Sequence, residues 1–221
     1  KTGFINHVLG QPIFQDGQAA SVEESDNAAV LIRHRGQEIE EAGSRALLSI
    51  VDLPNFGGKH GKKEAGKAVL SYMEDQFEAI LREESQLRRQ KDAQDSRIHS
   101  VIYFHNPSAH QLSKLDLELI GQMSKMANVL LVIAKGDTLL RHEYLRLKNN
   151  MREQLAEANI KVFQGSQQAH SPFEPFICVG GADLLASVPA RNYAWGSLKI
   201  NPSASPASLN INGLTSVLFK D

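Results

Sequence analysis

The chain has little cysteine, little net charge and no long apolar run, and each shortage excludes a class of protein. The single cysteine, Cys178, cannot form a disulfide within the chain, which fits a reducing compartment and a small core side chain. The formal net charge of −1 does not indicate a nucleic-acid partner. No apolar run approaches the roughly 20 residues of a membrane-spanning helix, and no secretory signal is visible.

What the chain does contain is the composition of a globular α/β domain. Its 221 residues correspond to one large domain or to a domain with an appendage, and 42% of them are apolar, which is ordinary for a packed core. Short apolar runs alternate with longer stretches of helical periodicity. This alternation predicts a parallel sheet wrapped by helices.

The apolar pattern also predicts the individual elements. Buried strands are expected at Leu47–Val51, Val101–Phe104, Val129–Ile133 and Phe176–Val179. An edge hairpin is expected from Val30–Ile32 and Gln37–Ile39, turning at Arg35 and Gly36. Helices are expected at Lys67–Arg89, Ser113–Met126 and Arg141–Asn159. Loops are expected at Gln164–Pro175 and Asn201–Pro206.

The most informative stretch is VLLVIAKGD, from Val129 to Asp137. It is a short apolar run that ends in Ala-Lys-Gly-Asp, and ligands bind at the carboxyl ends of buried parallel strands. The Asp137 carboxylate can accept hydrogen bonds from N1–H and the exocyclic amine of guanine, while the stem of Lys135 lies along the base. A buried acceptor of this kind rejects a mismatched base by roughly 10⁴-fold.

Two upstream signals support a phosphate site. Asp52 ends the apolar run Leu47–Val51, where a carboxylate commonly reaches Mg²⁺ through water. Lys1 and Thr2 match the end of the phosphate-loop pattern G-x-x-x-x-G-K-[ST], in which the lysine reaches phosphates and the threonine holds Mg²⁺. The glycine-rich half of that loop is not in the sequence, so either the chain is a fragment or Lys1 is an ordinary lysine.

Longer blocks resemble one family, the septins. The stretches Phe77–Arg89, Asp95–Ile120, Ala134–Lys148 and Arg191–Gly196 are similar to the septin GTP-binding domain. They include the septin patterns D-x-R-x-H, P-x-x-H-x-L-x-x-x-D and R-x-Y-x-W-G. The resemblance runs from Lys1 to about Gly196, which predicts a GTP-binding domain over residues 1–196. Residues 197–221 resemble, more weakly, part of the septin-specific extension.

The resemblance implies a fold and a function. The fold would be a P-loop GTPase-like three-layer α/β sandwich, with a mostly parallel sheet and helices on both faces. The protein would bind GTP or GDP, with Mg²⁺, and assemble with other septin subunits into cytoskeletal filaments or rings at the cell cortex, in the cytoplasm, during cell division. Any membrane association would use segments outside residues 1–221.

The resemblance also assigns residues to roles. Those at the nucleotide would be Lys1, Thr2, Asp52, Asn55, Lys135, Asp137, Gly180 and Arg191, of which Thr2 and Asp52 would serve the metal. Those at the subunit contact that contains the nucleotide would be His110, Thr138, Glu143 and Trp195.

Several of these residues have simpler explanations. His110 could be a solvated loop histidine, and Glu143 could only complement a helix dipole. Arg191 could lie on the surface, although the nearby Trp195 favours a platform for the base. The set His99, His105 and His110 is not completed by a cysteine or carboxylate, which argues against a metal site.

Two departures from the septin pattern bear on hydrolysis. The usual D-x-x-G is replaced by Asp52-Leu53-Pro54-Asn55, and the Asn55 side chain occupies space near the γ-phosphate. Ala29 falls where hydrolysing septins carry threonine, and it has no hydroxyl to hold water or Mg²⁺. Ser21 or Ser25 would fill that position only in a shifted register. Hydrolysis is therefore expected to be weak or absent, so the chain would have no catalytic residue.

Three hypotheses for function follow. The first is a nucleotide-binding filament subunit with little hydrolysis. The second is an active GTPase whose hydrolysis switches assembly. The third is a structural module with an empty pocket. A nucleoside kinase or an ATPase would leave Lys135 and Asp137 without a role.

Overall fold

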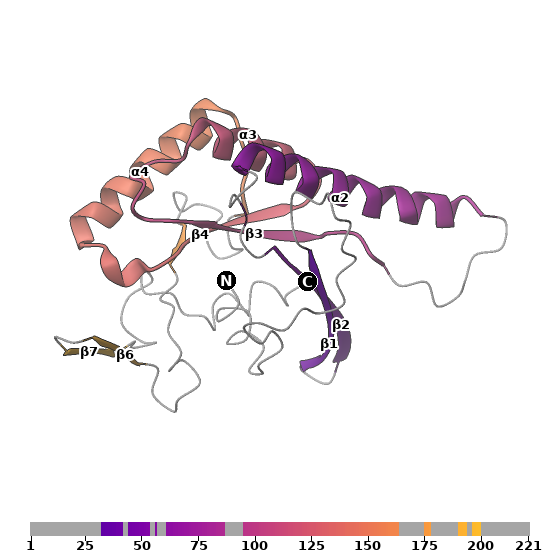
Figure 1. The fold of residues 1–221 in the computed structure, drawn as a ribbon, viewed down its shortest axis with the longest axis horizontal. Coiled ribbons are helices and arrows are strands. Elements are labelled where there is room, and N and C mark those ends of the chain that lie inside the picture. Colours follow the sequence, from indigo (N-terminus) through magenta and orange to yellow (C-terminus); the bar gives the residue numbers. More distant parts are fainter. Residues whose placement is uncertain are drawn as a thin grey trace. The chain divides into compact units, whose positions relative to one another are not determined.

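The computed structural model describes residues 32–41, 44–53, 56, 61–86, 95–163, 175–177, 190–193 and 196–199. The chain divides into two compact units. One contains strands β1 and β2 and helix α2, and the other contains the remaining elements, as the labels in Figure 1 allow the reader to follow.

Strands β1 (Arg33–Glu41) and β2 (Ser44–Asp52) form one long antiparallel hairpin, in which Arg33 lies opposite Asp52. The predicted turn at Arg35 and Gly36 is wrong, because both residues lie inside β1 and Gly36 lies opposite Ser49. Pairing along the full strand satisfies the backbone of Gly36, and this outweighs its local preference for a turn.

Strand β2 was correctly predicted as a strand but incorrectly as a buried one. Leu47 is 53% exposed, whereas Asp52 at the end of the strand is only 4% exposed. In the part of the chain that the structure describes, β2 pairs with β1 alone. The apolar run Leu47–Val51 therefore predicts a strand, but it does not predict whether other elements bury that strand.

Helix α2 (Lys62–Glu84) begins earlier than the predicted Lys67. It starts after Gly61, whose φ is 77°, a left-handed value that glycine adopts without strain. Its buried residues are Ala65, Gly66, Val69 and Met73. Ala65 and Gly66 are buried, but they are too small to stand out as part of an apolar stripe in the sequence. The start of the helix was therefore predicted too late, at Lys67.

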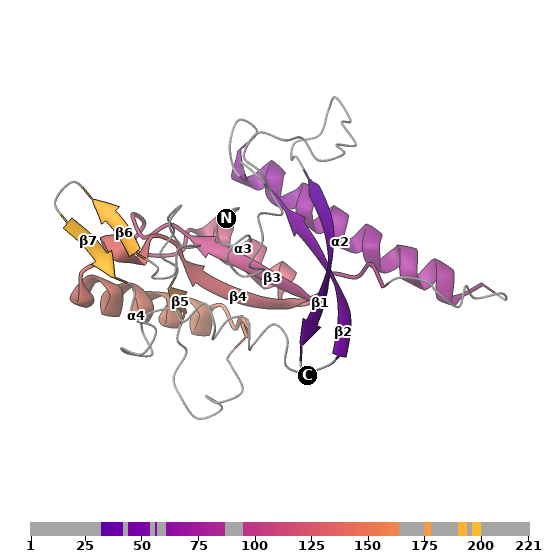
Figure 2. The same cartoon turned by 90° about the horizontal axis from the view of Figure 1, so that it is seen from below.

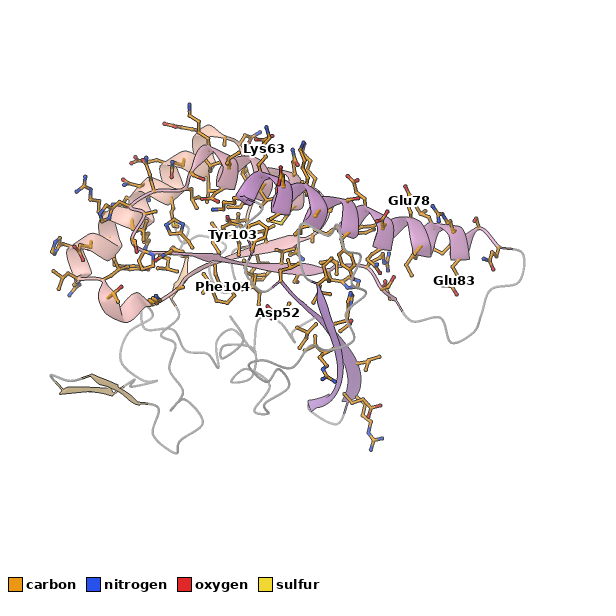
Figure 3. The ribbon with its side chains drawn as sticks, viewed as in Figure 1. Asp52, Lys63, Glu78, Glu83, Tyr103 and Phe104 are labelled. Carbon is orange, nitrogen blue, oxygen red and sulfur yellow. The ribbon has the colours of Figure 1, made fainter. Side chains whose placement is uncertain are left out.

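Polar contacts complete this unit. The Tyr72 hydroxyl lies 2.8 Å from His34 Nε2 and joins α2 to β1. Glu78 and Arg82 form an exposed ion pair one turn apart on α2, at 2.8 Å (Glu78 is labelled in Figure 3). Among the described helices, none is both long enough and apolar enough to cross a bilayer.

The second unit contains the predicted parallel sheet. Its strands, β3 (Ser100–His105), β4 (Asn128–Ile133) and β5 (Phe176–Ile177), are ordered β3-β4-β5, with His105 opposite Ile133. Val129 to Ile133 are each at most 2% exposed. Because successive residues of a strand point to opposite faces, both faces of β4 are covered, as expected for a parallel sheet.

Helices α3 (Lys114–Met123) and α4 (Arg141–Glu157) lie on one face of the sheet (Figures 1 and 2). Their buried apolar residues include Leu119, Ile120, Leu147, Met151 and Leu155. Both helices lie within their predicted ranges. A separate hairpin of β6 (Ala190–Tyr193) and β7 (Gly196–Lys199), not anticipated from the sequence, carries part of the R-x-Y-x-W-G pattern.

Candidate nucleotide and subunit-contact site

The segment after β4 forms a tight turn at the carboxyl end of the sheet. Lys135 has φ 52° and ψ 44°, and Gly136–Thr138 form the short 3-10 helix η1. The backbone N–H and the hydroxyl of Thr138 both donate to the Lys135 carbonyl, at 3.0 and 2.8 Å. A lysine in the left-handed region costs roughly 1–2 kcal/mol, and such strain concentrates at functional sites.

The same sheet edge brings a second loop beside this turn. The Ala134 N–H donates to the His105 carbonyl at 2.8 Å, which joins the end of β4 to the end of β3. The loop that carries His110 begins directly after His105. The predicted guanine segment and the predicted contact histidine therefore leave neighbouring strands at the edge where ligands bind in α/β proteins.

Residues 106–113, here called the His110 loop, are held by their own hydrogen bonds. Asn106 Oδ1 accepts from the Ser108 N–H and hydroxyl at 3.3 and 3.0 Å, and the Ala109 N–H donates to the Asn106 carbonyl. His105 Nε2 lies 2.7 Å from the Ala109 carbonyl, so this nitrogen carries the proton. His110 itself is exposed.

Helix α4 holds the same loop from the side. Leu112 is 1% exposed, and its N–H donates to Gln154 Oε1 at 2.9 Å. Gln154 Nε2 donates in return to the Leu112 carbonyl at 3.0 Å. Asn150 Nδ2, one turn earlier, donates to the His110 carbonyl at 3.1 Å. The loop backbone is thus paired with side chains far away in the sequence.

A buried carboxylate fixes the start of α3. Asp116, 3% exposed, accepts from the Ser113 N–H, while the Ser113 hydroxyl accepts from the Asp116 N–H in a reciprocal cap. The Tyr103 hydroxyl donates to the other Asp116 oxygen at 2.5 Å (Tyr103 is labelled in Figure 3). Burial, followed by the bond to Asp116, raises the pKa of Tyr103 far above its ordinary range.

The role of Asp116 was not predicted from the sequence, although Asp116 is the last residue of the P-x-x-H-x-L-x-x-x-D pattern. The spacing Ser-x-x-Asp from Ser113 to Asp116 was the available signal, because it is a capping pattern. No local signal predicts the bond to Tyr103, which lies on another element.

Asp52 has an environment that fits a cation. It ends β2 (Figure 3) and is 4% exposed, yet its Oδ2 accepts no hydrogen bond from the residues that the structure describes. Leaving a buried carboxylate oxygen unpaired is costly. Oxygen donors of this kind are the ligands that Mg²⁺ prefers.

Thr138 and Glu143 already have local partners. Thr138 bonds Lys135, as described above, and Glu143 Oε2 accepts from the Leu140 N–H at 2.9 Å, which satisfies a free donor at the start of α4. Glu143 therefore interacts with the start of its own helix, as the simpler explanation for this residue requires. Leu140 and Leu145 beside it are 61% and 45% exposed.

The D-x-R-x-H pattern forms a local exposed cluster. Arg97 Nε donates to Asp95 Oδ1 at 2.9 Å, and His99 Nε2 lies 3.4 Å from Asp95 Oδ2. The bond from Arg97 holds the pKa of Asp95 well below its usual range. Exposed pairs contribute little to stability. Within the described residues, no three histidine, cysteine or acidic side chains gather as a metal site.

Other predicted residues lie outside the described part of the chain. These are Lys1, Thr2, Ala29, Asn55, Cys178, Gly180 and Trp195. Asp137 lies in η1 and Arg191 in β6, opposite Leu198, but only their backbones are described.

Comparison with known proteins identifies the family of this chain. The Septin family model matches residues 1–214. Septin-1 of Rattus norvegicus is 32% identical over 220 residues, covering 91% of this chain and 60% of that protein. Septin-4 of Macaca fascicularis is also 32% identical over 220 residues, covering 91% of this chain and 46% of that protein. The chain thus spans less than two thirds of these relatives.

The fold is also that of a septin GTPase domain. A crystal structure of the septin GTPase domain from Chlamydomonas reinhardtii superposes with a TM-score of 0.69, at 20% identity, over 100% of this chain and 86% of that chain. The α/β fold with a parallel sheet, expected from the alternation of strands and helices, is confirmed. The chain belongs to the septin family and has the fold of a septin GTPase domain.

Proposed function

We propose that this chain is the guanine-nucleotide-binding part of a septin subunit that assembles through the face containing the nucleotide, with weak or absent hydrolysis. The observation that carries the proposal is the strained turn at Lys135–Thr138, directly after the buried parallel strand β4. Strain retained at the ligand-binding edge of an α/β sheet indicates a site where backbone shape serves recognition.

The turn supplies the base-reading groups. In the proposal the Asp137 carboxylate accepts the two guanine donors, and the Lys135 stem covers one face of the ring. Lys135 is exposed, so its stem is available to a ligand. Gly180 approaches the base, and Arg191 packs on it with Trp195 nearby.

The phosphates and their cation are assigned to the other end of the nucleotide. Lys1 would bind the phosphates, and Thr2 with Asp52 would hold Mg²⁺, directly or through water. The unpaired buried oxygen of Asp52 supports this part of the proposal, because a cation would satisfy it. Bound Mg²⁺ would neutralise phosphate charge.

Assembly would use His110, Thr138, Glu143 and Trp195 to contact another septin subunit. Because Ala29 and Asn55 remove or crowd the positions needed for attack by water, GTP would persist and keep this contact in one geometry. The resulting oligomer would belong to the septin cytoskeleton, in the cytoplasm at the cell cortex. Membrane association, if the whole protein has it, would use other segments.

Nucleotide content tests the first part of the proposal. The full-length protein is purified without added nucleotide, denatured by heat, and the supernatant is analysed by ion-exchange chromatography. We expect GTP or GDP in near-stoichiometric amount. No guanine nucleotide, together with no binding of added GDP, would leave only the structural module.

Single-turnover phosphate release separates the filament subunit from the active GTPase. We expect negligible release from bound GTP, and a higher rate in the double variant Ala29→Thr, Asn55→Gly. Rapid release by the unmodified protein would favour a hydrolytic switch. The variant Ser25→Thr alone serves as the control for the register, because it should leave the rate unchanged.

A further inference from the structure

We propose that His105, Asn150 and Gln154 are positioning residues that hold the His110 loop in one conformation, so that His110 is presented to another septin subunit already ordered. This rests on the proposed function, which assigns His110 to the subunit contact. None of the three residues needs to touch the partner. Their contribution would be to the shape of the surface that the partner meets.

Gln154 is the strongest of the three holds. Its side-chain amide both donates to and accepts from the backbone of Leu112, at 3.0 and 2.9 Å. Leu112 is 1% exposed, so its backbone groups have little access to water and need these partners. The amide therefore pairs with both backbone groups of Leu112, as a neighbouring strand would, and holds the loop at its buried end.

Asn150 extends this hold to His110 itself. It lies one turn before Gln154 on the same helix, and its Nδ2 donates to the His110 carbonyl at 3.1 Å. The two amides thus bind two alternate residues of the loop, His110 and Leu112. The His110 side chain stays exposed while its backbone is held.

His105 closes the other end of the loop and connects it to the guanine segment. Its Nε2 donates to the Ala109 carbonyl at 2.7 Å, and its own carbonyl accepts from the Ala134 N–H at 2.8 Å. His105 is 4% exposed, so it does not itself form a contact surface. One buried residue thereby links the loop to the strand end where guanine is proposed to bind.

A loop held in this way loses less conformational freedom when a partner binds. Connecting loops are usually among the most mobile parts of a domain, and ordering them on binding weakens the complex. Here two elements, β3 and α4, have already ordered the loop through the side chains of His105, Asn150 and Gln154. The arrangement indicates a contact surface that is formed before assembly.

The test compares matched variants of the full-length protein in the presence of GTP. Asn150→Ala and Gln154→Met remove the holds, while Asn149→Ala and Gln122→Met make the same changes at exposed helical positions. Hydrogen exchange of residues 108–113 is followed by mass spectrometry below the concentration at which the protein dimerises. We expect exchange about tenfold faster or more in the first pair, and no change in the controls.

Assembly is then measured by sedimentation velocity, with circular dichroism as a folding control. The variants Asn150→Ala and Gln154→Met should each raise the dimer dissociation constant by about fivefold or more. The same changes made in a His110→Ala background should have little further effect, because they act through His110. Asn150→Ala removes a single exposed bond and therefore leaves a folded protein even if Gln154→Met does not.

The outcomes are distinguishable. Unchanged exchange in the loop, or an equal loss of affinity with and without His110, would overturn the positioning role alone. A wild-type protein that stays monomeric at high concentration with GTP bound, and also with GDP bound, would overturn the proposed subunit contact and this role with it.

Discussion

Two single residues lie in states that folding alone does not favour. Lys135 has a left-handed backbone although it is not glycine, and Asp52 buries a carboxylate oxygen that no described residue pairs. Each state costs free energy, and the proposed ligands, guanine beside Lys135 and a cation beside Asp52, would offset that cost. At the scale of single residues, the strained backbone of Lys135 and the unpaired oxygen of Asp52 therefore support the proposed ligand contacts.

Replacing Lys135 by glycine separates stability from recognition. Lys135→Gly should raise the free energy of unfolding by up to about 1 kcal/mol, because glycine adopts φ 52° without strain. It should also weaken guanine-nucleotide binding, because it removes the stem that is proposed to cover the base. Urea unfolding and titration with fluorescent GDP measure the two effects.

Asn159 provides the matched control, since it has the same φ of 52° just after α4. Asn159→Gly should change stability only slightly, because asparagine tolerates this region, and should leave GDP affinity unchanged. A Lys135→Gly variant that binds GDP as tightly as the parent would contradict the assignment of Lys135.

Asp137 is the predicted source of specificity for guanine. Asp137→Asn should lower GDP affinity by at least about tenfold, or 1.4 kcal/mol, because one acceptor becomes a donor. The same fluorescent titration measures it, and Asp75→Asn on the exposed surface of α2 is the control. Equal affinities for parent and Asp137→Asn would show that this carboxylate does not bind the base.

At the scale of elements, hydrogen bonds between side chains of one element and groups of another hold the loops of the candidate site. The start of α3 is joined to β3 through Asp116 and Tyr103, and α4 is joined to the His110 loop through Gln154. Both links are buried or partly buried, so each satisfies groups that water cannot reach. The loops at the candidate site are therefore set by the packing of α3 and α4.

The link from β3 to α3 has a measurable effect on stability. Tyr103→Phe should lower the free energy of unfolding by about 1–3 kcal/mol, because Asp116 is 3% exposed and its oxygen would lose a donor. Urea unfolding followed by circular dichroism provides the value.

Tyr72→Phe is the control for this change. It removes an exposed hydrogen bond between α2 and β1, so the expected loss is within about 0.5 kcal/mol. Similar losses in the two variants would mean that the bond between Tyr103 and Asp116 contributes no more than a surface bond.

At the scale of the whole molecule, the prediction concerns assembly. In a two-fold contact each residue of the face meets its counterpart patch, so one substitution acts twice per dimer. Glu143→Arg should therefore raise the dimer dissociation constant more than a charge reversal elsewhere, for which Glu157→Arg at the end of α4 is the comparison. Sedimentation velocity with GTP bound measures both.

Because Glu143 also accepts the Leu140 N–H, its replacement costs some helix stability, of about 0.3–1 kcal/mol. Glu143→Gln keeps an acceptor while losing the charge, and it separates the two effects. If Glu143→Arg and Glu157→Arg weaken the dimer equally, Glu143 does not belong to the contact.

The sequence by itself determined the helices at Arg141–Glu157 and Lys114–Met123, the buried strand β4 and the segment that follows it. These features depend on the periodicity of neighbouring residues, which a sequence displays directly. The same local patterns carried the resemblance to septins, and the family model confirmed it.

Tertiary structure alone decided the course of β1 through Gly36, the burial of Asp52 and the hold of Gln154 on Leu112. Leu112 and Gln154 are 42 residues apart in the chain. A hydrogen bond across such a separation leaves no periodic trace in the sequence. It forms because packing brings two elements together and leaves buried polar groups that only each other can satisfy.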